Sequence, residues 1–398
     1  MSAAPDPREA GERTALVQPD PLWRREPWRL LFPEAMLAAL AGVGAWLTYG
    51  LGANVGYPSD FHAVAQIEGF LACIAAGFLF TFLPRRVGAP PATPLQVALA
   101  VLAPAVAVVA AALGAEVASQ AAWLVLVGVL LAFAAPRLAA AGATLKLPNA
   151  IVWVPAGLLF GAAGAVLRVW AGAAEDVPLR LAGQGLLTQG MLTALVVGVG
   201  ATLLPVLTRG VPHAETAGTA RDAAAKALHL AGAAALAASF FVEAEASPRL
   251  GCAVRAAVAL VTLLAAARID RLPTVPGLHR RLVWLSAWLL PLGYALAAVT
   301  PRYEEAGLHV VYIGGFALMA LSVGHHVAQA HGGTPRVLAG RPRRLVALAA
   351  LVLGALVLRG IVDLDRPHER VWLALASLAF LGATACWASL VLPRLRGV

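Results

Sequence analysis

Charged residues are scarce in this 398-residue chain: only 13% of the residues are Asp, Glu, Lys or Arg, whereas 60% are hydrophobic. A soluble globular domain carries about 25% charged residues. The mean hydropathy is +0.78, and apolar runs recur along the whole chain. These features exclude a soluble domain and predict an integral membrane protein. The runs predict helical spans, because only helices and closed barrels satisfy the backbone in lipid, and no short alternating strands are seen.

Cysteine is scarce as well, and the three cysteines are far apart in the sequence. Cys73, Cys252 and Cys386 all lie in apolar runs and form no CxxC pair, which is typical of small buried hydrophobic residues. The sequence has no CxxCH motif, so covalent c-type haem attachment is not indicated. It also has no glycine-rich nucleotide-binding motif between a strand and a helix. Since only short segments separate the apolar runs, we expect the chain to act within the membrane or at its two faces.

Twelve apolar segments come near the ~20 residues that a helix needs to cross a bilayer. They predict an all-α polytopic membrane protein with spans at 31–51, 62–83, 94–114, 117–139, 149–171, 180–206, 221–243, 249–268, 280–300, 305–328, 343–363 and 371–392. A re-entrant hairpin is an alternative for 94–139. We expect residues 1–30 to form a cytoplasmic tail, 31–392 a single transmembrane domain and 393–398 a short C-terminal tail. The stretch PLWRREPWRLLFP ends the first tail, and its Trp23, Trp28 and arginines suit the headgroup layer.

The net charge of +9 fits membrane orientation better than nucleic-acid binding. About three quarters of the 30 lysines and arginines fall in the tails and in alternate loops, as the positive-inside rule requires. Acidic pairs such as Glu175–Asp176 and Glu304–Glu305 fall in the other loops. We therefore expect both termini in the cytoplasm, a location in the cytoplasmic (inner) membrane, the lipid bilayer as partner and no nucleic acid.

Ionisable and amide side chains inside the spans are costly in lipid and usually functional. The candidates are few: Gln66, Glu68, Gln184, Thr188, Gln189, His229 and Arg255. In the span at 62–83, His62, Gln66 and Cys73 share one face of a regular helix, whereas Glu68 points about 240° away from His62.

The histidines gather at two depths. His62 and His309 lie near the predicted outer face, whereas His325, His326 and His331 lie near the inner face. His309 and His326 are about 25 Å apart along one helix, so they cannot bind the same metal ion. The pattern predicts an outer polar or metal-binding layer and a separate inner one.

These layers have two interpretations. Neutral imidazoles from neighbouring helices are the usual axial pair of a membrane-embedded b-type haem, and imidazole also suits copper. The alternative is that histidines at span ends are interfacial residues without a ligand. His325 and His326 are adjacent and point about 100° apart, so we expect them not to face one ligand together. Three further histidines are expected in solvated loops: His213, His279 and His368.

The chain resembles the NnrS family, twelve-span bacterial membrane proteins associated with haem, copper and nitric-oxide stress. The resemblance runs through FHAVAQIEGFLACIAAGFLFTFLPR, LLPVLTRG and LPLGY to the span at 305–328. The matched positions are His62, Gly69, Phe70, Gly77, Phe78, Thr81, Pro205, Thr208, Arg209, Leu290, Tyr294, His309, Met319 and His331. The family motif places a second histidine and a glutamate where this chain has Val64 and Ala65, a histidine at Pro291 and an arginine at His326.

The resemblance implies a membrane-embedded protein that binds haem b, and copper as a second metal, and acts in nitric-oxide or nitrogen-oxide stress or in metal handling. It implies His62 and His309 as outer ligands and His326 with His331 as inner ones; His325 is a further metal candidate. Met191 and Met319 are weaker soft ligands, and Gln66 and Glu68 would support the ligands or handle protons. The small partner would be a gaseous or metal ligand.

Two other classes of function remain open on the sequence alone. A transporter or channel without cofactor would use the polar set in the spans, from Gln66 to Arg255. A structural or assembly factor would leave the histidines interfacial. Whether the chain is an enzyme is left open.

Overall fold

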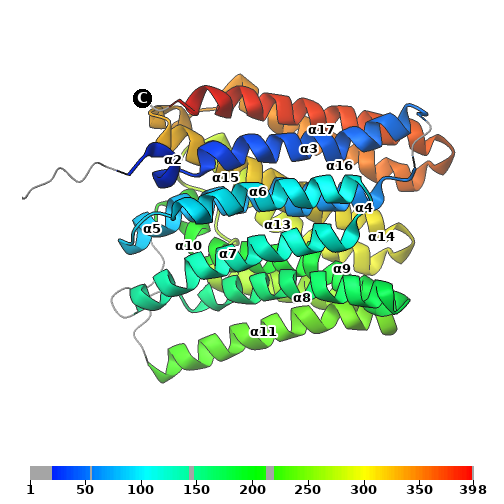
Figure 1. Ribbon diagram of the computed structural model, residues 1–398, viewed down its shortest axis with the longest axis horizontal. Helices are drawn as coiled ribbons and strands as arrows, with labels where there is room; N and C mark the ends of the chain where they lie inside the picture. The colour runs from blue at the N-terminus through cyan, green and yellow to red at the C-terminus, as the bar shows by residue number, and fades with distance from the viewer. Residues whose placement is uncertain (1–19, 54–55, 143–147, 212–218, 397–398) are drawn as a thin grey trace, which may run out of the picture.

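The protein is a bundle of helices that run roughly along one axis (Figure 1). The computed structural model describes residues 20–396 except 54–55, 143–147 and 212–218. Within these ranges there is no strand, and twelve helical stretches are long and apolar enough to cross a membrane. The all-α polytopic fold is thereby confirmed, whereas the orientation in the membrane stays a prediction.

The α-helices are α2 (Leu22–Arg25), α3 (Trp28–Gly50), α4 (Ser59–Val64), α5 (Ala72–Val87), α6 (Pro94–Ala112), α7 (Glu116–Gly142), α8 (Trp153–Ala173), α9 (Val177–Gly185), α10 (Met191–Arg209), α11 (Ala220–Glu245), α12 (Pro248–Thr262), α13 (Leu278–Val299), α14 (Glu304–His309), α15 (Leu318–His331), α16 (Arg343–Leu364) and α17 (Glu369–Val391). Four π-helical segments continue them: η1 (Ala65–Leu71), η3 (Leu186–Gly190), η4 (Leu263–Ala267) and η6 (Val310–Ala317). The 3₁₀ segments are η2 (Asn149–Val152), η5 (Pro301–Tyr303), η7 (Pro335–Ala339), η8 (Arg366–His368) and η9 (Leu392–Arg394).

Each predicted span corresponds to one of these stretches. The segments at 94–114 and 117–139 are two full helices, α6 and α7, so the re-entrant alternative is wrong. The span that carries His309 is longer than predicted and runs from Pro301 to His331 through η5, α14, η6 and α15.

The two ends of the bundle differ in what they carry. Helix α2 and the C-terminal end of the chain lie at one end, whereas α4 and α14 lie at the other (Figure 1). We name these the inner end and the outer end, after the predicted orientation.

The two tryptophans expected in the headgroup layer differ in exposure, while their depth in the membrane stays a prediction. Trp28 is fully buried and packs on Phe32 with ring centroids 5.5 Å apart, because helix α3 begins at this residue and turns it toward the core. Trp23, on the short helix α2, remains 38% exposed.

Helix boundaries follow local capping chemistry. Four helices begin after a side chain that accepts a hydrogen bond from a backbone N–H three residues on: Thr93, Asp176, Thr219 and Ser247. Such a cap satisfies one of the N–H groups that a helix start leaves unpaired. Helices α5 and α10 end at Gly88 and Gly210 in the left-handed conformation, which glycine adopts at little cost.

Glycine allows α13 to approach α14 closely. A Cβ atom on Gly307 would lie 2.5 Å from the backbone N of Ala297, and one on Gly293 would lie 2.8 Å from the carbonyl O of Gly307. Small residues at such crossings let helix backbones pack closely in membranes. The contact fixes the helix that ends at His309.

We predict that Gly307→Ala lowers stability by about 1–3 kcal/mol, because the added methyl group overpacks a backbone contact. Thermal unfolding of the purified protein in detergent measures the change. The matched control is Gly354→Ala on α16, where a Cβ atom meets nothing within 4 Å. Equal melting temperatures for wild type and Gly307→Ala would contradict the contact.

Candidate functional site

A cavity of about 630 Å³ lies at the outer end of the bundle. Its volume falls in the range of about 300–1,000 Å³ that is typical of small-molecule and cofactor sites. Apolar side chains make up much of the wall: Val43, Ile67, Phe70, Leu71, Leu181, Leu308, Ile313, Ala317, Ala355, Leu373 and Phe380. The cavity is therefore a largely apolar chamber to which a few polar groups are added.

Three π-helical segments contribute to the wall of this cavity. Gln66 comes from η1, Thr188 from η3 and Tyr312 from η6. A π-turn inserts one extra residue into a helix and is frequent at functional sites. His62 and Gln66 line the cavity, whereas Cys73, beyond η1, is buried in the core. All three side chains contact helix α3, at Gly42, Ala39 and Glu34, as the predicted shared face implies.

His62 and His309 both line this cavity. The Nδ1–H of His62 donates to the carbonyl O of Gly42 at 3.0 Å, and the Nδ1–H of His309 donates to the carbonyl O of Glu305 at 2.7 Å. A carbonyl can only accept, so Nδ1 carries the proton in each ring and Nε2 keeps its lone pair. This arrangement is the usual one for a histidine that binds a metal through Nε2.

Arginine side chains add positive charge to the cavity wall. Arg168, Arg180 and Arg359 line it, together with the carboxylates of Asp60 and Glu305. These arginines are not among the site residues predicted from the sequence, although Arg168 and Arg359 lie inside predicted spans and an ionisable residue there is a signal in itself.

A second polar group lies between η3, α11 and α12 around Arg255, which is fully buried. Its guanidinium donates to Gln189 Oε1 at 2.5 Å, to Glu243 and to Cys252 Sγ at 3.4 Å, and it stacks on the ring of Phe240. Two intramembrane residues singled out from the sequence, Gln189 and Arg255, are thus partners.

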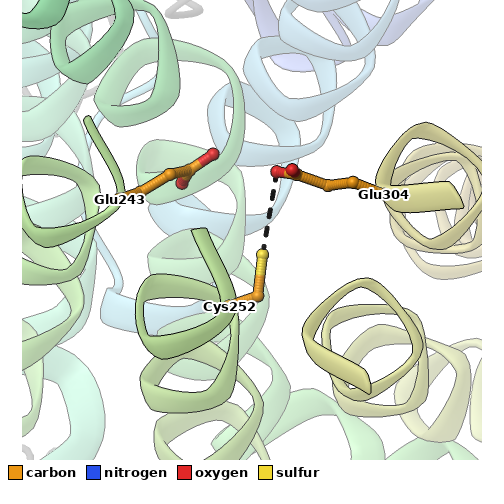
Figure 2. A group of neighbouring side chains, drawn as sticks. All are labelled: Glu243, Cys252 and Glu304. Atoms are coloured by element: carbon orange, nitrogen blue, oxygen red, sulfur yellow. Dashed lines mark hydrogen bonds between the residues drawn. The ribbon is translucent and has the colours of Figure 1, made fainter. Parts of the chain in front are cut away.

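Glu243, Cys252 and Glu304 converge beside Arg255 from three different helices (Figure 2). Their ligand atoms lie within 4.8 Å of one another, which is close enough to surround a metal ion. The guanidinium of Arg255 already supplies a cation to Glu243 and Cys252. An added metal ion would have to displace it, so we assign the cluster to the internal ion pair.

The other intramembrane polar residues have separate partners. Gln66 donates to the carbonyl O of Ala39 at 3.3 Å. Glu68 is fully buried and accepts from Gln120 at 2.9 Å. His229 accepts from Trp153 Nε1 at 3.2 Å.

The inner histidines pair differently from the expectation. Nε2 of His279 lies 3.1 Å from Nδ1 of His326, within hydrogen-bond distance, and the ring of His325 lies edge-on to His279 with centroids 5.8 Å apart. His279 is 1% exposed, so its assignment to a solvated loop is wrong: it lies in the first turn of α13 and faces α15. The ring of His331 instead accepts from Arg85, whose guanidinium also holds Glu26.

The two remaining histidines give little further information. His368 is exposed at the outer end and bonds to Asp365. His213 lies outside the described residues.

The positions where the chain departs from the motif it resembles do not line the cavity. Val64, Ala65 and Pro291 are buried in the helix core, and none belongs to the cavity wall. Met191 and Met319 are also core residues away from the cavity. The histidines that do line it, His62 and His309, are both matched positions, whereas the third matched histidine, His331, lies at the inner end.

The fold and site together define a polytopic helical membrane protein with an imidazole-bearing cavity at one end. The chain belongs to the NnrS family: the family model described as NnrS protein matches residues 21–398. A comparison with curated proteins finds no match. The predicted family is thereby confirmed over almost the whole chain.

We predict that Arg255→Met destabilises the fold by about 3–5 kcal/mol, because it leaves Glu243 without its cation. Adding Glu243→Gln should recover part of the loss by removing the unpaired charge. Thermal unfolding in detergent measures both variants. The control is Arg249→Met, an exposed arginine on the same helix. No greater loss in Arg255→Met than in the control would refute the ion pair.

We further predict that Glu26, at the inner end, contributes to the stability of the fold in a pH-dependent way. Burial raises the pKa of this carboxyl, but hydrogen bonds from Arg85 and Arg29 outweigh that effect and hold the pKa below its usual 4.5. The carboxylate therefore stabilises the fold above pH 4.5, and the contribution fades as the pH falls through the lowered pKa. Glu26→Gln should lower the melting temperature at pH 7, with a difference that shrinks below pH 4.5. The exposed Glu245→Gln serves as control, and a pH-independent difference would rule out the linkage.

Proposed function

We propose that the chain is a membrane-embedded haem b protein of the NnrS type that acts in nitric-oxide or nitrogen-oxide stress. The observation that carries the proposal is the pair His62 and His309 in one cavity. Both rings are fixed by Nδ1–H bonds to backbone carbonyls, so each Nε2 is available to iron. Histidine is a common protein ligand of haem iron.

The residues present fit a haem group in three respects. The cavity volume is of cofactor size, the wall is largely apolar, and arginines are available for two carboxylates. His62 and His309 would hold the iron, and Phe70, Leu308 and Phe380 would pack against an apolar ring system. Bound haem iron would supply an open-shell metal that binds small diatomic molecules such as nitric oxide.

The site would limit access by polar reactants while admitting small uncharged ones. Apolar side chains lower the local dielectric around a cofactor, which is one of the protein's means of tuning a redox potential. Gln66, which donates to Ala39 O, and Tyr312, whose hydroxyl lies 3.2 Å from that of Thr188, are the polar groups placed to contact a ligand there.

We propose the inner pair His279–His326 as the place for copper. Their ring nitrogens lie 3.1 Å apart, and two nitrogens that each bind one ion at about 2 Å lie about 3–4 Å apart. Neutral imidazoles suit copper. His331, held by Arg85, is less suited to the role that the resemblance implies.

The rival function, transport without a cofactor, has weaker support. Gln66, Gln184 and Thr188 line the cavity, but Glu68 and Arg255 are occupied by internal partners away from it. These pairs give the polar set structural roles that do not require a transport path.

We predict that the purified protein, supplied with haem, shows a reduced-minus-oxidised haem b band. The band should be lost or shifted in His62→Ala and in His309→Ala, because each removes an iron ligand. His368→Ala, at an exposed histidine of the same end, should keep the band. Gel filtration confirms that the variants are folded. Metal analysis that finds no iron at stoichiometric level in the wild type would contradict the proposal, and a spectrum with no haem b band would favour the rival.

A further inference from the structure

The arginines of the outer cavity differ in how far their guanidinium groups are already used. Arg168 is held on all sides: Nε donates to Glu116 at 2.7 Å, one Nη donates to Gln184, and the other lies 3.5 Å from Asp60. Its side chain is only 4% exposed. Arg168 therefore serves to fix its neighbours and has little capacity left for a ligand.

The guanidinium of Arg359 has N–H groups that make no hydrogen bond with the described residues. Its Nη2 donates to Glu305 at 2.7 Å, while its Nη1 is buried and has no hydrogen-bond partner. Oδ2 of Asp363 lies 3.7 Å from Nη1, beyond hydrogen-bond distance, and the other oxygen of that carboxylate lies 3.0 Å from Arg366. Because a buried guanidinium N–H without a hydrogen bond is unfavourable, Arg359 gains by turning toward an incoming anion.

Arg180 offers a second set of donors from a different wall. One Nη donates to both oxygens of Glu116 at 3.1 Å, and the side chain is 40% exposed. The described contacts thus use one of its three guanidinium nitrogens. Arg180 comes from α9 and Arg359 from α16, so the two donors reach the cavity from separate helices.

The carboxylate that now pairs with Arg359 is easily displaced. The side chain of Glu305 is 61% exposed and can return to water at small cost. An ion pair with an exposed partner contributes little to stability, because water competes for that partner. An anion in the place of the Glu305 carboxylate would accept from Nη2 of Arg359, and a guanidinium that turns toward it can bind a carboxylate in a bidentate manner.

We infer that the cavity selects a flat apolar dianion by its two carboxylates, with Arg359 and Arg180 as the carboxylate-binding residues. The apolar wall packs against the flat part of the ligand. The two arginines bind its carboxylates and so determine which edge of the ligand faces the outer end. For a tetrapyrrole this fixes the orientation of the two propionates. The inference rests on the proposed function, because it concerns the same cavity and the same class of ligand.

The test uses metal-free protoporphyrin IX and its dimethyl ester as probes, so that iron ligation plays no part. Binding to the full-length protein in lipid nanodiscs is measured by porphyrin fluorescence, with empty nanodiscs subtracted. We expect the diacid to bind wild type at least about tenfold more tightly than the ester, since a hydrogen bond to a charged group is worth about 1.5–3 kcal/mol.

Single substitutions test which arginines cause the preference for the diacid. Arg359→Met and Arg180→Met should each weaken diacid binding about tenfold and leave ester binding unchanged, and Arg359→Lys should recover part of the loss. The control is Arg370→Met: Arg370 lies at the same end, stacks on Tyr49 and does not line the cavity. Ester binding at wild-type level shows that a variant is folded.

Two results would overturn the inference: equal binding of diacid and ester to wild type, or the same loss in Arg370→Met as in Arg359→Met. Failure of the haem proposal would look different. His62→Ala and His309→Ala should leave the preference for the metal-free diacid intact, so an absent haem band with a retained diacid preference would reject iron ligation and keep the arginine assignment.

Discussion

Backbone hydrogen bonding inside the membrane is the constraint on which the structure depends. Lipid offers no partner for an unpaired N–H or C=O group, so a span cannot open a loop to build a site. A π-turn is compatible with this constraint, because it keeps the ladder hydrogen-bonded while it inserts a residue. Segments η1, η3 and η6 do this where their helices meet the outer cavity. The cavity thus forms among continuous helices.

The charged side chains at the outer end are subject to a similar constraint, because lipid and apolar side chains cannot solvate them. Charges in a low-dielectric wall are stable only when paired: Glu116 pairs with Arg168 and Arg180, and Glu305 and Asp363 pair with Arg359. The pairing of Arg359 is incomplete, because its buried Nη1 has no hydrogen bond within the described part of the chain. The two cavity histidines, His62 and His309, are each fixed by a hydrogen bond from Nδ1, which leaves Nε2 with its lone pair. Together these features are the ones that the proposed haem ligand would require.

The sequence was sufficient for the fold and for part of the site. Apolar length predicted the spans, and equal depth predicted that His62 and His309 belong to one layer; both line the cavity. The π-helical segments could not be predicted, because regular periodicity does not reveal an inserted residue. The burial of His279 depends on the turn at Gly277, where φ is +136° and an added Cβ atom would lie 3.3 Å from His279 Nδ1; both features come from tertiary packing. Arg168 and Arg359, by contrast, were visible as charges in spans.

The central claim is that Nε2 of His62 and of His309 binds iron in the outer cavity. The most direct measurement is electron–nuclear double resonance on the ferric protein with ¹⁵N-labelled histidine. The account predicts strong coupling of the iron to histidine nitrogen, reduced in His62→Ala and in His309→Ala and unchanged in His279→Ala. Iron without histidine coupling, or coupling that survives removal of both cavity histidines, would contradict it.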